Sequence, residues 1–180
     1  QLDEQGVSDF SVLSRAEWHL LADVPFVYTA CEVDRQGDSG MCHIAKLNGL
    51  NGEVAWAVQV PCTRHNINNK HFDGGMYSTP LLGGGNCSDL IFSTLANDGV
   101  NGDGHFYAFE KRTGKVVYKT KLKHYAWSSP VGFYNEKNEL FIVVGDTYGY
   151  LYLIEGKSGR IIYDERFGTN FESSPVVVGN

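Results

Sequence analysis

The sequence predicts an all-β fold, and three observations lead to this expectation. Short apolar segments such as residues 150–154 alternate with a period of two, as the side chains of a strand do when they face the two sides of a sheet. Glycine supplies 21 of the 180 residues, and its clusters separate these segments as turns do. The longest apolar run, residues 140–144, has the length of a strand.

Composition excludes several classes of protein. The 15 basic and 21 acidic residues give a formal charge of −6, which argues against a nucleic-acid-binding surface. No apolar run reaches the roughly 18 residues of a transmembrane helix, so we expect no membrane span. Aromatic residues make up 13% of the chain, which argues against intrinsic disorder.

The main signal is an internal repeat with an offset of 45 residues. Residues 104–118 read GHFYAFEKRTGKVVY, and residues 149–163 read GYLYLIEGKSGRIIY. The same offset carries the Ser-Ser-Pro-Val of residues 128–131 onto residues 173–176. Two units of one kind therefore follow each other along the chain.

A looser copy of the repeat lies at residues 44–56, and its Ser-x-Pro element follows at residues 78–80. The repeat glycine precedes the proline by 28 residues here and by 16 residues in the later copies. This copy therefore carries an insertion of 12 residues within residues 61–76.

Each unit reads as four short strands joined by turns rich in Gly, Asn and Asp. In the last full unit we expect strands at residues 130–133, 140–144, 150–154 and 160–163. Four antiparallel strands in about 45 residues are typical of one blade of a β-propeller. The sequence therefore predicts a β-propeller of four-stranded antiparallel blades.

The repeat boundaries divide the chain into about three blades and an additional strand. We expect strands of the first blade at residues 17–21 and 26–30. The predicted divisions are a lead-in at residues 1–16, blades at residues 17–77, 78–127 and 128–172, and a further blade starting at residues 173–180. Propellers have about four to eight blades, so we expect a larger ring that a longer chain or another copy completes.

The residue pattern is more specific than the fold. Each of the two later units begins with Gly, any residue, a hydrophobic residue and Tyr, followed by two hydrophobic residues and Glu. After two further residues come Ser or Thr, then Gly, then Lys or Arg, two aliphatic residues and a final aromatic residue. This pattern, together with the Ser-Ser-Pro-Val that follows it, resembles the PQQ-like repeat. The resemblance covers roughly residues 17–180. This family includes the propellers of quinoprotein dehydrogenases and non-enzymatic relatives such as the outer-membrane assembly lipoproteins.

The repeated residues have structural explanations. Gly114 and Gly159 lie in tight turns that need a positive φ, which glycine adopts without steric cost. An aromatic residue at one position of each unit is expected to pack between neighbouring blades: Trp56, Tyr118 and Tyr163. A proline marks the start of each inner strand, where a missing backbone donor is tolerated: Pro80, Pro130 and Pro175. We assign no catalytic residue among them.

Four cysteines are scattered along the chain, with no Cys-x-x-Cys pair. Cys31 and Cys42 would face each other across two adjacent strands, so we predict a disulfide between them. Cys62 and Cys87 are then paired by elimination. Two disulfides indicate a location outside the cytoplasm: periplasmic, secreted or lumenal. The alternative is four buried thiols in a reducing compartment.

The insertion holds the candidate partner-binding residues. Arg64, His65, Lys70 and His71 lie in it, and such side chains could build a metal or catalytic site, or a solvated polar loop. Loops on propellers often bind partners, so we expect partner contact here. The oxygen-rich residues 97–104 lack the glutamate that closes an EF-hand loop, so we expect no metal there.

Two functions remain in view. The first is a non-catalytic scaffold outside the cytoplasm that binds a protein or a small-molecule ligand. The alternative is a segment of a PQQ-dependent quinoprotein dehydrogenase. Resemblance to these enzymes would imply a pair of vicinal cysteines, a bound calcium ion and an aspartate that acts as a base. The sequence has no adjacent cysteines and no match for the calcium ligands or the base, which favours the scaffold. We therefore expect no enzymatic activity and no cofactor, with calcium or PQQ as the alternative.

Overall fold

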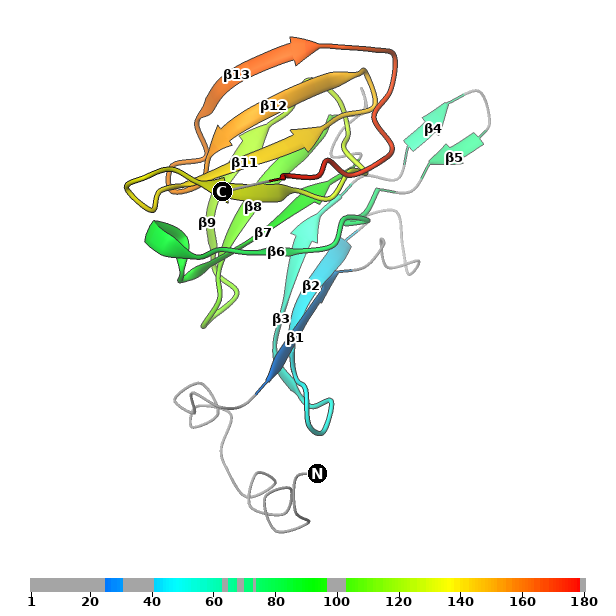
Figure 1. Cartoon of the computed structure of the whole chain (residues 1–180). Helices are drawn as coiled ribbons and strands as arrows, with labels where there is room; N and C mark the ends of the chain where they lie inside the picture. Colours follow the sequence, from blue (N-terminus) through cyan, green and yellow to red (C-terminus); the bar gives the residue numbers. More distant parts are fainter. Residues whose placement is uncertain are drawn as a thin grey trace.

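The computed structural model describes residues 25–30, 41–62, 65–67, 70–72, 74–96 and 103–178 (Figure 1). These residues form strands, turns and one short 3-10 helix, η1 (Gly85–Cys87). The predicted all-β fold is confirmed. The strand expected at residues 17–21 lies outside the described residues.

The described residues form four antiparallel sheets, three of which follow one another as blades, and we call these blades 1 to 3. In each sheet every strand pairs with the next strand in sequence. Blade 1 consists of β1 (Phe26–Ala30), β2 (Met41–Asn48) and β3 (Val54–Pro61). Blade 2 consists of β6 (Leu81–Leu82), β7 (Leu90–Leu95), β8 (His105–Glu110) and β9 (Val116–Lys121). Blade 3 consists of β10 (Val131–Tyr134), β11 (Leu140–Gly145), β12 (Tyr150–Glu155) and β13 (Ile161–Arg166).

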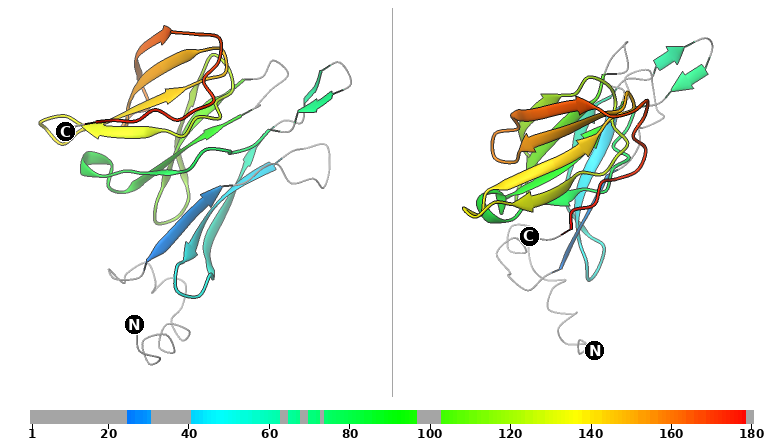
Figure 2. Two further views of the ribbon diagram at one scale, coloured as in Figure 1. Left: turned by 45° about the vertical axis from the view of Figure 1, so that its right-hand side comes forward. Right: turned by 45° about the horizontal axis from the view of Figure 1, so that its top comes forward.

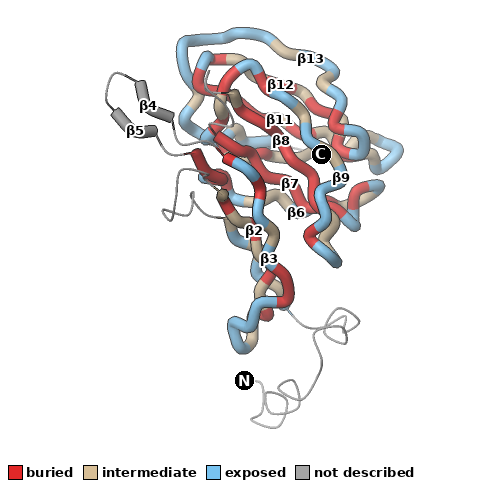
Figure 3. Tube along the Cα trace, turned by 180° about the vertical axis from the view of Figure 1, so that it is seen from behind, coloured by how far each residue is buried: buried red, intermediate tan, exposed pale blue. Residues whose placement is uncertain are grey.

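The blades lie side by side, with blade 2 in the middle (Figure 2). Alternate residues of each strand face opposite neighbours, so apolar residues on both sides of blade 2 are buried. One core, between blades 1 and 2, is built around Ile44, Trp56 and Phe109. The other, between blades 2 and 3, is built around Phe92, Phe106 and Ile142. Buried residues accordingly concentrate in β7, β8 and β11 (Figure 3).

The repeated aromatic residue joins each blade to the next. Trp56 of blade 1 donates its Nε1–H to the Lys111 carbonyl of blade 2 at 3.0 Å. Its ring lies over Gly114, where an added Cβ would come within 2.7 Å of Trp56 Cε3. The prediction that this aromatic residue packs between blades is confirmed for Trp56.

Tyr118 repeats this contact one blade further on. Its hydroxyl donates to the Gly156 carbonyl of blade 3 at 2.7 Å, and its ring lies over Gly159. In both cases the acceptor precedes the turn glycine by three residues. Burial raises the pKa of Tyr118 above its ordinary value, so this hydroxyl stays protonated and able to donate.

A second contact between blades comes from the Ser-x-Pro elements. The backbone N–H of Thr79 donates to the Ser129 hydroxyl at 2.8 Å, and the backbone N–H of Ser129 donates to the Ser174 hydroxyl at 2.9 Å. The acceptor is thus always the equivalent residue of the following unit. Each repeat therefore satisfies a backbone donor of the repeat before it.

Because consecutive strands in each blade are antiparallel neighbours, the loops between them lie at two opposite ends of the blade. The turns at residues 49–53, 111–115 and 156–160 lie at one end, which we call the turn face. The chain passes from one blade to the next at the opposite end, which we call the connection face, through residues 122–130 between blades 2 and 3. The turn at residues 146–149 lies at the connection face too. Among the described residues, no helix has the length and apolar character needed to cross a membrane.

Candidate binding surface

The predicted partner-binding insertion forms a β-hairpin at the connection face (Figure 1). Its strands are β4 (His65–Ile67) and β5 (Lys70–Phe72), with His65 opposite Phe72 and His71 opposite Asn66. The hairpin follows β3 and leaves the blade-to-blade path. Arg64 lies outside the described residues.

Next to the connection between blades 2 and 3, aromatic rings form a continuous cluster. The ring of His124 stacks on Tyr148, with centroids 3.6 Å apart and planes 11° from parallel. His124 also contacts Tyr125 at 4.2 Å, and Tyr125 contacts Trp127 at 5.3 Å. The cluster thus joins two loops of the connection face.

Hydrogen bonds fix the position of the histidine at the centre of this cluster. The Thr147 hydroxyl lies 3.1 Å from the Tyr125 carbonyl, which can only accept, so Thr147 donates its proton there. Thr147 Oγ1 therefore accepts the Nδ1–H of His124, at 2.6 Å. Burial lowers the pKa of His124 below its ordinary value, and the carboxylates of Asp146 and Asp103 act in the opposite direction.

A fully buried carboxylate anchors the same loops. Asp146 accepts hydrogen bonds from the backbone N–H groups of His124, Tyr148 and Tyr150 at 2.9–3.2 Å. It also accepts the hydroxyl proton of Tyr152 at 2.5 Å. Burial and this hydrogen bond raise the pKa of Tyr152 above its ordinary value. Asp146 is therefore occupied in holding the backbone of the loops.

Three large rings of this surface remain accessible to a ligand. Tyr77 is 40% exposed, Trp127 38% and Tyr148 52%. A cavity of ≈ 250 Å³ lies beside Tyr77, between β1 and residues 78–80. Sequence reasoning did not single out these rings. The available signal was that Tyr77 and Trp127 each directly precede a Ser-x-Pro element.

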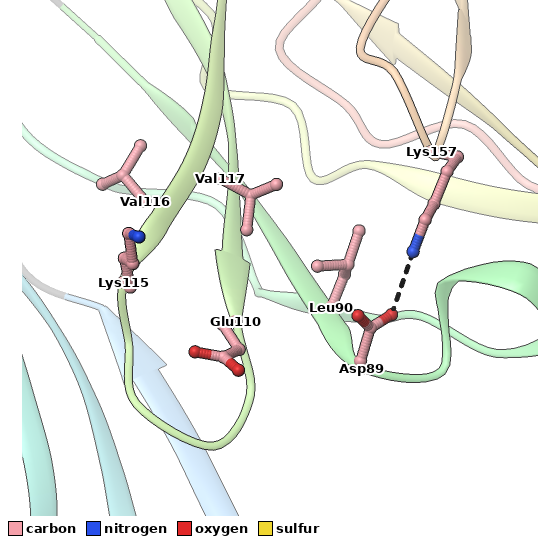
Figure 4. A pocket seen from close by; sticks show the side chains of 7 residues that line it. All are labelled: Asp89, Leu90, Glu110, Lys115, Val116, Val117 and Lys157. Carbon is pink, nitrogen blue, oxygen red and sulfur yellow. Dashed lines mark hydrogen bonds and ion pairs between the residues drawn. The ribbon is translucent and has the colours of Figure 1, made fainter.

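A larger cavity, of ≈ 360 Å³, lies at the turn face (Figure 4). Its charged side chains are two acidic and two basic residues, and Lys157 Nζ lies 3.5 Å from Asp89 Oδ1. Binding sites for small molecules are usually apolar hollows with a few polar groups that fix the ligand. The cavity is lined by Asp89, Leu90, Glu110, Lys115, Val116, Val117 and Lys157. Because these charges compensate one another at the surface, we assign no ligand to it.

The predicted disulfide between Cys62 and Cys87 is not formed in the structure. Cys87 carries a free thiol, buried in the core between blades 2 and 3, and it donates to Asn86 Oδ1 at 3.3 Å. Cys62 is buried in the other core, between blades 1 and 2. The two residues therefore belong to different interfaces, which pairing by elimination could not detect. Cys31 lies outside the described residues, so its bond to Cys42 stays a prediction.

Within the described part of the chain, no cluster of His, Cys, Asp and Glu is arranged to hold a metal ion. Of the oxygen-rich residues 97–104, only Asp103 and Gly104 are described. Asp103 forms an ion pair with Lys121, with Oδ2 and Nζ 2.9 Å apart. This carboxylate is therefore paired with the last residue of β9.

Comparison with known proteins gives the fold its context. No family model matches the chain, and no curated protein does. Among solved structures, BamB from Moraxella catarrhalis is similar at 14% identity and a TM-score of 0.51, over 82% of this chain and 40% of that one. A europium-containing methanol dehydrogenase is similar at 10% identity and a TM-score of 0.53, over 85% of this chain and 36% of that one.

The chain thus spans about two fifths of the length of these proteins. Both are β-propellers, and both similarities extend across most of the chain. They support the resemblance to the PQQ-like repeat at the level of the fold. The chain has the fold of a PQQ-like β-propeller, of which the described residues form three consecutive blades.

Proposed function

We propose that this chain is a non-catalytic binding scaffold that acts outside the cytoplasm and binds a protein ligand at its connection face. The observation that carries this proposal is the set of exposed rings of Tyr77, Trp127 and Tyr148 on one face. Tyrosine and tryptophan are enriched at protein interfaces, where they contribute much of the binding energy.

The base under these rings is rigid, which favours binding. His124 is held between Tyr148 and Thr147, and Asp146 fixes the backbone of both loops. A surface that is already ordered loses little conformational entropy when a ligand binds. The β4–β5 hairpin extends the same face, which agrees with a role for the insertion in partner contact.

A selection experiment tests the proposal. Peptides from a random display library are selected on the wild-type chain, and their affinities are then measured for Trp127→Ala and Tyr148→Ala. We expect a loss of at least about tenfold for each variant, as for a ring in the centre of an interface. Tyr163→Ala, which removes an equally exposed ring on blade 3, is the control and should keep the affinity.

Two outcomes would overturn the proposal that the chain is a binding scaffold. One is that the selected peptides bind Trp127→Ala and Tyr148→Ala as tightly as the wild type. The other is that the chain, given PQQ and calcium, develops the absorption of a bound cofactor and oxidises an alcohol with an artificial dye as acceptor. The second result would establish the dehydrogenase alternative.

A further inference from the structure

Arg166, the last residue of β13, holds a guanidinium group at the connection face beside Tyr148. Its Nε–H donates to the Tyr148 carbonyl at 2.9 Å and to the Gly168 carbonyl at 3.2 Å. These two acceptors fix the direction of the group, and the residue is exposed. Arginine carries five N–H donors in a planar fork, so the four donors on the two Nη atoms stay available to a ligand.

This arginine lies on the side of β13 that faces blade 2. Side chains alternate along a strand, so Arg166 is on the same side as Asp164. Asp164 forms an ion pair with Lys123 of the connection between blades 2 and 3, with Oδ2 and Nζ 2.8 Å apart. In the register of β12 and β13 these two residues lie opposite Tyr150 and Tyr152, which pack in the core between the same blades. The position of Arg166 is therefore set by two described blades and does not depend on the outer face of blade 3.

Comparison of the repeats shows which group is missing next to this arginine. The offset of 45 residues places Arg166 on Lys121 of blade 2, and it places Tyr148 on Asp103. In blade 2 the basic and the acidic residue form an ion pair, with Nζ and Oδ2 2.9 Å apart. In blade 3 a tyrosine stands in place of the acid, and no carboxylate of the described residues forms an ion pair with Arg166. The basic charge is thus kept in blade 3 without its counter-ion.

The acidic residues of the adjoining loop and strand are engaged in other contacts. Asp146 is fully buried and accepts hydrogen bonds from three backbone N–H groups and a tyrosine hydroxyl. Asp164 is in its ion pair, and Glu165 accepts the hydroxyl proton of Tyr163 at 3.3 Å. The acceptor for the Nη donors of Arg166 is therefore expected from a ligand, and the exposed rings of the same surface offer that ligand apolar contact.

We propose that the protein ligand of the connection face presents an Asp or Glu side chain to Arg166 and a neighbouring large apolar side chain to the rings of Tyr148 and Trp127. This inference rests on the proposed function and names the chemistry of its partner. The guanidinium group forms two parallel hydrogen bonds to a carboxylate, whose single charge it matches, whereas phosphorylated ligands are bound by clusters of arginines. A terminal carboxylate is usually bound by backbone N–H groups, but the backbone groups next to this guanidinium are carbonyls.

The peptides selected on the wild-type chain supply the probe. We expect the tightest binder to contain an acidic residue next to a large apolar one, and a matched peptide carries Asn or Gln in place of that acid. Fluorescence anisotropy measures the affinity of both peptides for the wild type and for Arg166→Gln. Each single change should weaken binding by about tenfold or more, as expected for the loss of a hydrogen bond to a charged group. Both changes together should weaken it little more than either one alone, because they remove the same contact.

Two further variants serve as controls. Arg166→Lys keeps the charge but not the planar fork, so it should restore only part of the affinity. Arg160→Gln removes an exposed arginine at the turn face, whose Nε lies 3.7 Å from Glu155 Oε2, and it should bind the acidic peptide as the wild type does. Circular dichroism checks that each variant keeps its fold, and the comparison of the two peptides on the wild type needs no variant at all.

The outcomes separate this inference from the proposed function. If Trp127→Ala and Tyr148→Ala weaken binding while Arg166→Gln does not, or if the neutral peptide binds the wild type as tightly as the acidic one, the acidic partner is overturned and the binding scaffold stands. A loss that follows amidation of the peptide's C-terminus, in place of the side-chain change, overturns the acidic side chain in favour of a terminal carboxylate. Peptides that bind both ring variants as tightly as the wild type overturn the proposed function, and this inference with it.

Discussion

Alanine substitution of the repeat glycines separates the cost of backbone conformation from the cost of lost space between blades. Gly52, Gly114 and Gly159 have nearly the same positive φ, so an added Cβ strains the backbone equally at all three. A non-glycine residue in this conformation costs about 1–2 kcal/mol. Gly52→Ala should therefore lower the free energy of unfolding by about that amount and no more, since nothing lies within 4 Å of the new Cβ.

The other two positions should cost more, because the neighbouring blade fills the space. At Gly114 the new Cβ would lie 2.7 Å from Trp56 Cε3 and 2.6 Å from Val58 Cγ2, and at Gly159 it would overlap the ring of Tyr118. Overpacking of a filled core costs a further 1–3 kcal/mol or so. We therefore expect Gly114→Ala and Gly159→Ala to lower the free energy of unfolding by about 2–5 kcal/mol.

Urea unfolding followed by circular dichroism measures these differences. The double variant Gly114→Ala/Trp56→Ala adds a second readout. Removing the ring relieves the contact with Trp56 and leaves the contact with Val58, so the two losses should sum to more than the loss in the double variant, by about 1–3 kcal/mol. Equal losses at Gly52, Gly114 and Gly159, within about 0.5 kcal/mol, would refute the packing of Trp56 and Tyr118 on the following blade.

Three further predictions concern groups inside the blades. Burial lowers the pKa of His124, so below about pH 6.5 the unfolded chain binds more protons than the folded chain. The free energy of unfolding, measured by urea titration, should therefore fall as the pH drops from about 7 to 5. The variant His124→Asn should show a weaker dependence on pH over this range. Asp146→Asn should lower the free energy of unfolding by about 2–4 kcal/mol, because an amide cannot accept hydrogen bonds from all four donors. Asp103→Asn, which breaks an exposed ion pair, is the control and should lower it by at most about 1 kcal/mol. Equal losses in the two variants would contradict the anchoring role of Asp146. Cys87 is buried and its pKa is raised by that burial, so peptide mapping after alkylation should find it modified only at urea concentrations that unfold the chain, and rapid labelling of the native protein would contradict its place in the core.

The repeat made the fold predictable, because residues at equal offsets must have equal roles. Strands expected at residues 140–144 and 150–154 occur as β11 and β12 with one more residue each. The partner of each repeated aromatic residue was not predictable in the same way. Trp56 meets Lys111 at a separation of 55 residues and Tyr118 meets Gly156 at 38, and nothing local records these distances.

The candidate surface was predicted only in part. The insertion was predicted to contact a partner, which stays a prediction, and the structure shows that it forms a hairpin at the connection face. The cluster around His124 was missed, because its members come from two loops that are adjacent only after blades 2 and 3 pack. The pairing of Cys62 with Cys87 failed for the same reason, since elimination counts cysteines without knowing which core each one enters.

The burial of blade 2 on both sides has a consequence for how the native state opens. All six residues of β7 are buried, whereas β13 has no buried residue. In a linear array of repeats each unit is stabilised only by its neighbours, so an outer unit can detach by breaking one interface while the middle unit must break two. The amide hydrogens of β7 should therefore exchange with solvent last, and those of β13 early. Local unfolding is therefore expected to begin in the outer sheets. A chain in which blade 3 has detached still retains the packed core between blades 1 and 2, around Ile44 and Phe109.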